Sequence, residues 1–464
     1  MFELNFLLKH PLFNYFQKTF KFLKMNTKTT TKFSKKITIV LLFFTMTTFC
    51  IGQTNPTTNP QNPGIIISDS QELKKRDYGV PEISKNKLVI RYKNNPSESR
   101  KSELRKIYRV KNATECKCGN SNIELWEFES KAEIEQIVSN QQEKDDTEVE
   151  IDHEFTYYAS KSYNSQNSVK DISEYIIREG NKNRINVAVI DTGIDLGSFE
   201  KPFLYDSSKT GILPTQQSGW NFINNTPNVQ DDHGHGTAVT KIIASNLNDI
   251  EYSILPVKAF DYNGKTSYWS LVCALEYLNN FPDIHIINGS FGYEKLKNKG
   301  TFKTILKETD IIQQLIDDLK NQAIYVASAG NKCKNTDSNR GKHYPSGFKN
   351  SNILTVGGTK LSKCIFRKNK IVKHRKSNYG IISIDLAAPF TFNILGKAQH
   401  GTSFSTAYIT SKCAQLLHKQ PSVYKTKRGS EVIFNSELLK KEVFKNAKES
   451  SNLRKCFKEA KYYQ

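Results

Sequence analysis

Five short and almost wholly apolar runs recur through the second half of the chain, and they constrain its fold more than any other feature. They are INVAVID (185–191), YSILPVKAF (252–260), IHIINGSFG (284–292), QAIYVASAG (322–330) and NILTVGG (352–358). Runs of this kind, rich in β-branched residues, are typical of strands that are buried on both faces. Helical patterns lie between and after them, at 236–247, 270–281, 305–322 and 404–419. The sequence therefore predicts an α/β fold with a mainly parallel sheet between two helical layers.

A smaller unit precedes this region. Strand patterns lie at 87–93, 122–130 and 147–158, helical patterns at 96–108 and 132–142, and a further strand is indicated near 109–116. The succession β-α-β-β-α-β predicts a small α+β domain with two helices on one face of a sheet. A polar stretch, ASKSYNSQNSVKD (159–171), then separates it from the larger region.

The first 52 residues have the pattern of an export signal. The stretch SKKITIVLLFFTMTTFCIG (34–52) has a Lys pair, then about a dozen apolar residues, then a small residue before Gln53. This run is shorter than the roughly 20 apolar residues that a membrane span needs. We expect Met25 to be the translational start and the mature protein to be secreted, extracellular or periplasmic, without a membrane span. The chain then divides into a leader (1–52), a linker with the small domain (53–160) and the large domain (161–464).

The formal net charge of +21 is unevenly distributed. Residues 161–464 carry a net charge of +17, whereas residues 53–160 carry −3. Such basicity often indicates nucleic-acid binding. The Lys residues are scattered, however, without a compact basic helix or an aromatic-interleaved patch. We therefore expect no nucleic-acid partner and interpret the basic surface as complementary to the acidic segment.

Seven cysteines remain once the leader, which holds Cys50, is removed. An exported protein can form disulfides, and an odd number leaves at least one thiol free or paired between chains. The sequence CKCG at 116–119 is a weak metal signal, because no second Cys or His pair follows at ligand spacing. We expect the pairs Cys333–Cys364 and Cys413–Cys456.

Two residues that could take part in catalysis lie at the ends of predicted elements, one at the end of a strand and one just before a helix. Asp191 ends the first apolar strand within INVAVIDTGID, and alone it fits an aspartic protease or a turn cap as well as a catalytic carboxylate. His235 lies between two glycines just before a helix, where substrate could approach closely. A loop histidine that caps the helix is the structural alternative.

Two more residues complete the set. Asn331 follows the strand IYVASAG, where its amide could donate to a developing oxyanion or simply form a turn. Ser403 lies in GTSFSTA at the start of a helix, where a hydroxyl is most often only a cap. Together with Asp191 and His235 they supply a nucleophile, a base, an orienting carboxylate and an oxyanion donor. The order Asp, His, Ser is one that hydrolase triads use. An aspartic protease would need a second D-T-G or D-S-G, and the sequence contains none.

The motifs as a group resemble one known family. The blocks VAVIDTGID, GHGTAVTKIIAS, INGSFG, VASAGN, YPSGFKNSNILTVGG and GTSFSTA, in this order, resemble the subtilisin-like (subtilase) serine proteases over roughly 185–449. Residues 85–158 are similar, by pattern and position, to the inhibitory propeptide of that family. The resemblance implies a three-layer αβα fold and an endopeptidase that is made as a self-processing zymogen.

The resemblance also implies roles for individual residues. Ser403 would be the nucleophile, His235 the general base and then the acid, and Asp191 the group that orients the imidazole. Asn331 and the Ser403 backbone N–H would form the oxyanion hole.

Substrate would bind as an added strand between two edges, one at Gly264 and one at Ser290, Phe291 and Gly292. Ser328, Ala329 and Gly330 would form one wall of the pocket for the side chain before the scissile bond. These small residues predict an open, mostly apolar pocket that prefers large apolar or aromatic side chains.

No cofactor and no metal ligand are expected to be required. The segment ASNLNDIEYSIL (244–255) is shorter than the loop that often binds structural calcium in the family, so calcium stays possible but unassigned. The expected partners are protein or peptide substrates and the chain's own propeptide, and we expect a monomer. The alternative function is a catalytically silent subtilase-fold binding protein.

Overall fold

The computed structural model describes residues 78–117, 122–143, 148–159, 172–177, 184–200, 203–207, 218–294, 310–364, 367–428 and 431–464. All of these residues belong to one compact unit, 72–464. The expected signal peptide, the expected Met25 start and most of the linker lie outside the described residues. Within the described ranges, no helix combines the length and the apolar character that a membrane crossing requires.

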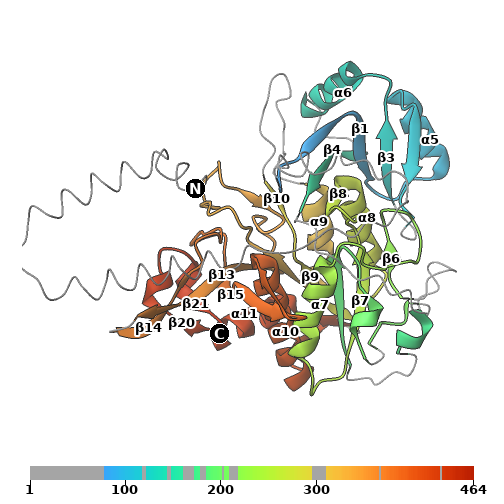
Figure 1. Cartoon of the computed structure of the whole chain (residues 1–464). Helices are drawn as coiled ribbons and strands as arrows, with labels where there is room; N and C mark the ends of the chain where they lie inside the picture. The colour runs from blue at the N-terminus through green and yellow to red at the C-terminus, as the bar shows by residue number, and fades with distance from the viewer. Residues whose placement is uncertain are drawn as a thin grey trace, which may run out of the picture. The chain divides into compact units, whose positions relative to one another are not determined.

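The small domain has the predicted succession of elements (Figure 1). They are β1 (Glu82–Tyr92), α5 (Glu98–Ile107), β2 (Asn112–Glu115), β3 (Ile123–Glu127), α6 (Lys131–Glu143) and β4 (Val149–Tyr158). The strands form an antiparallel sheet in the order β2-β3-β1-β4. One face packs on the two helices through residues such as Leu104, Trp126 and Ile134. The boundary at 160 falls in the gap 160–171 and stays a prediction.

The large domain is built on a mainly parallel sheet in the order β20-β21-β15-β13-β11-β9-β5-β7-β6. Its central strands are β5 (Ile185–Asp191), β7 (Tyr252–Lys258), β9 (Ile284–Gly289), β11 (Ile324–Ser328), β13 (Ile353–Cys364) and β15 (Leu386–Pro389). The edges are β6 (Trp220–Asn221), β20 (Lys448–Glu449) and β21 (Lys461–Tyr462). All five predicted strands are present, and the pairs among the central strands are parallel.

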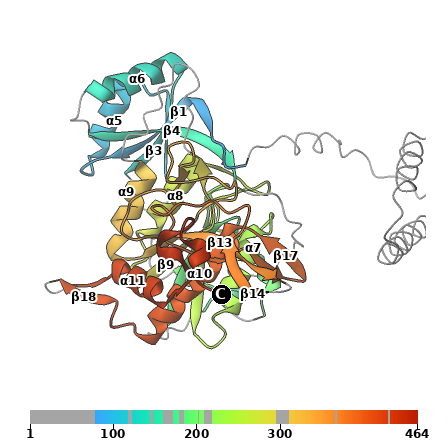
Figure 2. The ribbon, with the colours of Figure 1, turned by 90° about the vertical axis from the view of Figure 1, so that its left-hand side faces the viewer.

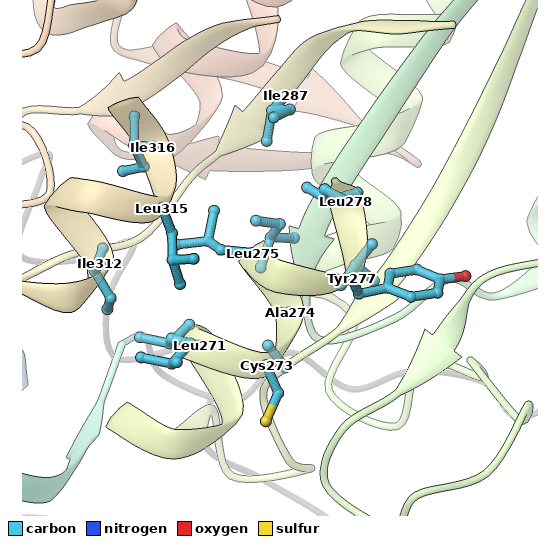
Figure 3. Close-up of a cluster of buried hydrophobic side chains, with 14 of the residues drawn as sticks. Leu271, Cys273, Ala274, Leu275, Tyr277, Leu278, Ile287, Ile312, Leu315 and Ile316 are labelled. Carbon is cyan, nitrogen blue, oxygen red and sulfur yellow. The ribbon is translucent and has the colours of Figure 1, made fainter. Parts of the chain in front are cut away.

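Helices cover both faces of this sheet, as predicted. They are α7 (His235–Ser245), α8 (Tyr268–Leu278), α9 (Ile311–Asp318), α10 (Thr402–Lys419) and α11 (Ser436–Asn446). Alternate residues of β5 point to opposite layers: Val187 and Val189 pack with α7, α10 and α11, and Ala188 and Ile190 pack with α8 and α9. Figure 3 shows the second cluster, in which side chains of α8 and α9 meet Ile287 of β9.

The free face of the small-domain sheet packs on α8 of the large domain. Phe155 and Tyr157 of β4 join the cluster that contains Tyr268 and Leu271. Figure 2 shows α5 and α6 on the far side of the small sheet from α8 and α9. Strand β4 also pairs antiparallel with β8 (Lys265–Ser267), so that the small sheet continues into the large domain.

The sequence did not predict several peripheral elements. They are the strand β14 (Arg367–Lys373), the hairpins β16–β17 (Thr391–Ile394, Lys397–His400) and β18–β19 (Lys425–Arg428, Glu431–Phe434), and the pair β10–β12 (Tyr293–Glu294, His343–Tyr344). Short helical turns lie at Ile172–Tyr175, Leu196–Ser198, Leu319–Asn321, Ser451–Leu453 and Lys458–Ala460.

The expected disulfides are wrong. Cys333, Cys413 and Cys456 are free thiols, as is Cys273. Cys413 lies fully buried on α10 in the cluster formed with β5 and α7, whereas Cys456 packs in a separate C-terminal cluster. Cys116 is disulfide-bonded.

The C-terminal segment is a structural part of the large domain, which predicts a stability effect. Phe457 is fully buried, and its ring lies against Gly357 of β13. Phe457→Ala should lower the free energy of unfolding by about 3–5 kcal/mol because it leaves a cavity. Denaturant titration would measure this, with the exposed neighbour Lys455→Ala as the control. An effect no larger than that of the control would contradict the account.

Candidate active site

The buried pair formed by Asp191 and His235 is the centre of the site. Asp191 is the last residue of β5 and His235 the first of α7. Asp191 Oδ1 and His235 Nδ1 are 2.7 Å apart, and both side chains are almost inaccessible to solvent. Because the carboxylate can only accept, the imidazole proton lies on Nδ1, and Nε2 carries the lone pair. The pair therefore presents a base at Nε2.

Asp231 connects the start of α7 to the residue that follows β5, and it was not predicted from the sequence. Its carboxylate is fully buried and accepts from the backbone N–H groups of His233, Gly234 and Thr237 at 2.7–3.0 Å. It also accepts the hydroxyls of Thr192, at 2.8 Å, and Thr237, at 2.6 Å. The signal that could have found it is an acid placed just before the helix start, where it can cap the free N–H groups.

The charge state of His235 follows from these neighbours. Burial by itself lowers the pKa of a histidine, but the Asp191 carboxylate, the hydrogen bond to it and the charge of Asp231 outweigh burial. The pKa of His235 is therefore raised. Burial and the nearby His235 lower the pKa of His233 instead. Two histidines two residues apart thus have pKa values shifted in opposite directions.

Ser403 is the second residue of α10 and is 9% exposed. Its hydroxyl donates to the backbone carbonyl of Ser290 at 2.8 Å, and the Ser290 hydroxyl donates to the Ser403 carbonyl at 2.9 Å. This reciprocal pair ties the end of β9 to the start of α10. The Ser403 backbone N–H belongs to the first turn of the helix, where such groups have no partner within the helix.

Asn331 is fixed beside Ser403 through its amide oxygen. That oxygen accepts the Thr402 backbone N–H at 2.9 Å and the Thr402 hydroxyl at 3.1 Å. Because a backbone N–H can only donate, the oxygen of the amide faces Thr402 and the NH₂ group is left free to donate elsewhere. Asn331 is exposed, and its loop is held by Asn378, which accepts the Lys332 N–H at 3.0 Å.

A single cleft of about 850 Å³ brings these groups together. It is lined by His235, Asn331 and Ser403, and by the predicted substrate-binding residues Ser290, Phe291, Gly292, Ser328 and Gly330. Asp191 lies buried behind His235. The walls are joined, because the Ser328 hydroxyl donates to the Phe291 carbonyl at 3.0 Å.

Two predicted binding residues are not among the residues that line this cleft. Ala329 is fully buried and packs in the C-terminal hydrophobic cluster, so its side chain is not part of the cleft wall. Gly264 has a positive φ of 69°, and its carbonyl accepts the Ala159 N–H at 2.8 Å. Gly264 therefore lies at the edge that holds the end of the small domain.

The described residues offer no evident metal centre. Among them, no group of three or more His, Cys, Asp or Glu side chains is placed to hold a metal ion.

The cleft and the Asp191–His235 pair contain the kinds of group that serine hydrolases use. Comparison with known proteins gives the family: the model of the subtilase family, peptidase S8, matches residues 182–455, and the chain belongs to that family. The protein is therefore a serine-type endopeptidase by family, and its substrates are proteins or peptides.

Curated relatives are distant. Thermitase of Thermoactinomyces vulgaris is 25% identical over 242 residues, which cover 50% of this chain and 71% of thermitase. Subtilisin-like protease 1 of Plasmodium falciparum is 24% identical over 288 residues, or 54% of this chain. The match spans only 40% of that longer protein.

Two solved structures of proteases align with much of this chain. The epidermin leader peptide processing serine protease of Staphylococcus aureus aligns with 80% of this chain and 95% of its own, with a TM-score of 0.48 and 15% identity. A cold-adapted subtilisin-like serine proteinase aligns with 63% of this chain and 96% of its own, with a TM-score of 0.43 and 18% identity.

The Asp191 contact makes a prediction about the titration of His235. In the Ser403→Ala protein, NMR of the imidazole should give His235 a pKa above the ordinary 6.5. Asp191→Asn removes the charge that raises the pKa and leaves burial, which lowers it, so the pKa should fall. His285, whose pKa is lowered by burial and receives no contribution from Asp191, is the internal reference. An unchanged His235 pKa would contradict the assigned pair.

Proposed function

We propose that the protein hydrolyses peptide bonds through an acyl-enzyme on Ser403, with His235 as general base and Asp191 as its orienting carboxylate. The observation that carries this proposal is the 2.7 Å bond between Asp191 and His235 in a cleft that also contains Ser403 and Asn331. The family supports the class of reaction, and the geometry supports the assignment of roles.

The first step requires a small rotation of the nucleophile. In the resting arrangement the Ser403 hydroxyl donates to the Ser290 carbonyl. Rotation about χ1 brings its proton to His235 Nε2, after which Oγ attacks the substrate carbonyl. The charge that develops on His235 is stabilised by Asp191, because the bond at Nδ1 is already formed.

The tetrahedral intermediate needs donors for its oxyanion. The free NH₂ group of Asn331 and the backbone N–H of Ser403 are the two candidates, and the start of α10 adds partial positive charge. As the intermediate collapses, protonated His235 gives its proton to the leaving amine. Water then attacks the ester, with His235 again as base, and releases the acid and free Ser403.

The small domain is proposed to be an inhibitory propeptide. Its last strand, β4, pairs with the edge strand β8, and Ala159 lies in the cleft. A peptide substrate would add to the same edge, because backbone groups there accept an extended strand. The domain therefore occupies a position that substrate would need.

Carboxylates of β4 hold the two domains together. Asp152 accepts the Ile311 N–H at the first turn of α9 at 2.7 Å, and Glu154 accepts the Trp269 N–H at the first turn of α8 at 2.9 Å. Negative charge at a helix N-terminus is stabilising, although for Glu154 the cost of burial outweighs this effect and raises its pKa. Arg91 of β1 also forms an ion pair with Asp318 of α9.

We further propose that the precursor is exported and cleaves itself in the polar stretch near 158–168. Residues 160–171 lie outside the described part of the chain, and the proposal rests on the sequence and on Ala159 in the cleft.

Self-processing predicts a mass difference. The purified wild-type precursor should lose its N-terminal segment, whereas Ser403→Ala should keep its full mass. Mass spectrometry of both proteins measures this, with Ser405→Ala, further into α10, as the matched serine control. Maturation of Ser403→Ala to the same size, in the absence of another protease, would contradict self-processing.

The oxyanion donor predicts a loss of rate. Asn331→Ala should lower kcat by about 10²–10³, the range known for loss of one such donor in subtilisin, with little change in KM. The exposed Asn452→Ala is the control. A loss confined to KM would show that Asn331 binds substrate and does not stabilise the transition state.

The carboxylates of β4 predict a pH dependence. Burial raises the pKa of Glu154 to about 7. The hydrogen bonds from the Trp269 N–H and the Ser267 hydroxyl, and the charge of Lys87, lower this pKa but do not outweigh burial. A raised carboxyl pKa favours the folded state below the ordinary value of 4.5, and this advantage is lost as the pH rises through about 7.

Thermal unfolding of the Ser403→Ala precursor measures the effect. Glu154→Gln, which keeps an acceptor for the Trp269 N–H, should flatten the decline in Tm from about pH 5 to about pH 8. Glu129→Gln, at an exposed site, should not. The Glu154 assignment fails if both variants follow the parent curve.

A further inference from the structure

His343 lies between the two walls of the cleft, where a substrate side chain would be expected to enter. A Cβ added to Gly292 would lie 2.1 Å from His343 Cε1 and 2.7 Å from Nε2. A Cβ added to Gly330 would lie 2.9 Å from Nε2 and 3.0 Å from Cδ2. One edge of the imidazole therefore contacts the backbone of both walls, Ser290–Gly292 and Ser328–Gly330.

The ring is held in this position from behind. His343 begins β12, which pairs with β10, and Nδ1 lies 2.9 Å from the Ser346 hydroxyl. That hydroxyl donates to the His343 carbonyl at 3.2 Å. Because a hydroxyl has one proton, Nδ1 donates to Ser346, and the Nε2 lone pair faces the glycines.

The ring is uncharged at neutral pH. Burial lowers the pKa of His343 to about 4; among nearby charges, Glu294 opposes this and Lys332 and Lys334 add to it. Glu294 is itself paired with both lysines, at 3.2 Å to Lys332 Nζ and at closer contact to Lys334. The uncharged His343 ring therefore occupies this part of the cleft, next to the ion pairs that Glu294 forms with Lys332 and Lys334.

We propose that His343 sets the depth of the specificity pocket, so that the residue whose carbonyl is attacked carries a short side chain, such as that of Ala or Ser. This inference rests on the proposed function and replaces the large apolar or aromatic preference expected from the small wall residues. Those residues leave space between the walls, but the imidazole occupies its inner end. A bulky ring could enter only if His343 left its contacts with Ser346 and the two glycines.

The test is a peptide series that differs only at the residue before the scissile bond, with Ala, Ser, Leu, Phe or Glu at that position. The mature wild-type enzyme should have its highest kcat/KM for Ala or Ser. His343→Gly should raise the ratio of kcat/KM for Phe over that for Ala by about tenfold or more, because pocket volume sets such ratios. Ser346→Ala, which keeps the ring, should change the ratio much less.

Four outcomes decide the matter. Highest activity of the wild type on Leu, Phe or Glu overturns the inference, even if His343→Gly does not fold. An unchanged Phe/Ala ratio in a folded His343→Gly protein also overturns it. Labelling of Ser403 by a fluorophosphonate does not depend on this pocket, so labelling without the predicted preference rejects the pocket assignment alone. Absence of labelling rejects the proposed function itself.

Discussion

The burial of β5 on both faces is the constraint on which the rest of the structure depends. Val187 and Val189 face one helical layer, and Ala188 and Ile190 face the other. A strand that is covered in this way pairs with parallel neighbours, so the carboxyl ends of β5, β9 and β11 lie along one edge of the sheet. Asp191 is the last residue of β5, Ser290 comes directly after β9, and Asn331 lies shortly after β11, so all three lie at that edge. The starts of α7 and α10 then bring His235 and Ser403 to the same place.

A feature could be predicted from the sequence when the residues that cause it lie close together in the chain. The strands of the central sheet were predictable because a strand that is buried on both faces consists of consecutive apolar residues. Strand β14, RKNKIVK, was not, because it is polar and pairs only with the extension of β13. Asp231 could have been found from capping rules. His343 could not, because its importance comes from Gly292 and Gly330, which lie far from it in sequence.

Strand β4 makes most of the contacts described here between the small domain and the large domain. Strand β4 continues the small sheet onto β8, and its carboxylates Asp152 and Glu154 meet the starts of α9 and α8. Three kinds of contact thus coincide: a backbone ladder, helix caps and an apolar cluster around Phe155 and Tyr157. Each is a common device, and together they place Ala159 in the cleft.

The central claim is that Ser403 is a nucleophile activated by His235, and covalent labelling tests it most directly. The mature protein would be treated with a fluorophosphonate and digested, and the modified residue located by tandem mass spectrometry. The account predicts one adduct on Ser403 in the mature wild type and in Ser405→Ala, and a labelling rate that falls once the pH drops below the pKa of His235, because a protonated imidazole cannot act as a base. An adduct on a different residue, or a labelling rate that does not change over this pH range, would contradict it.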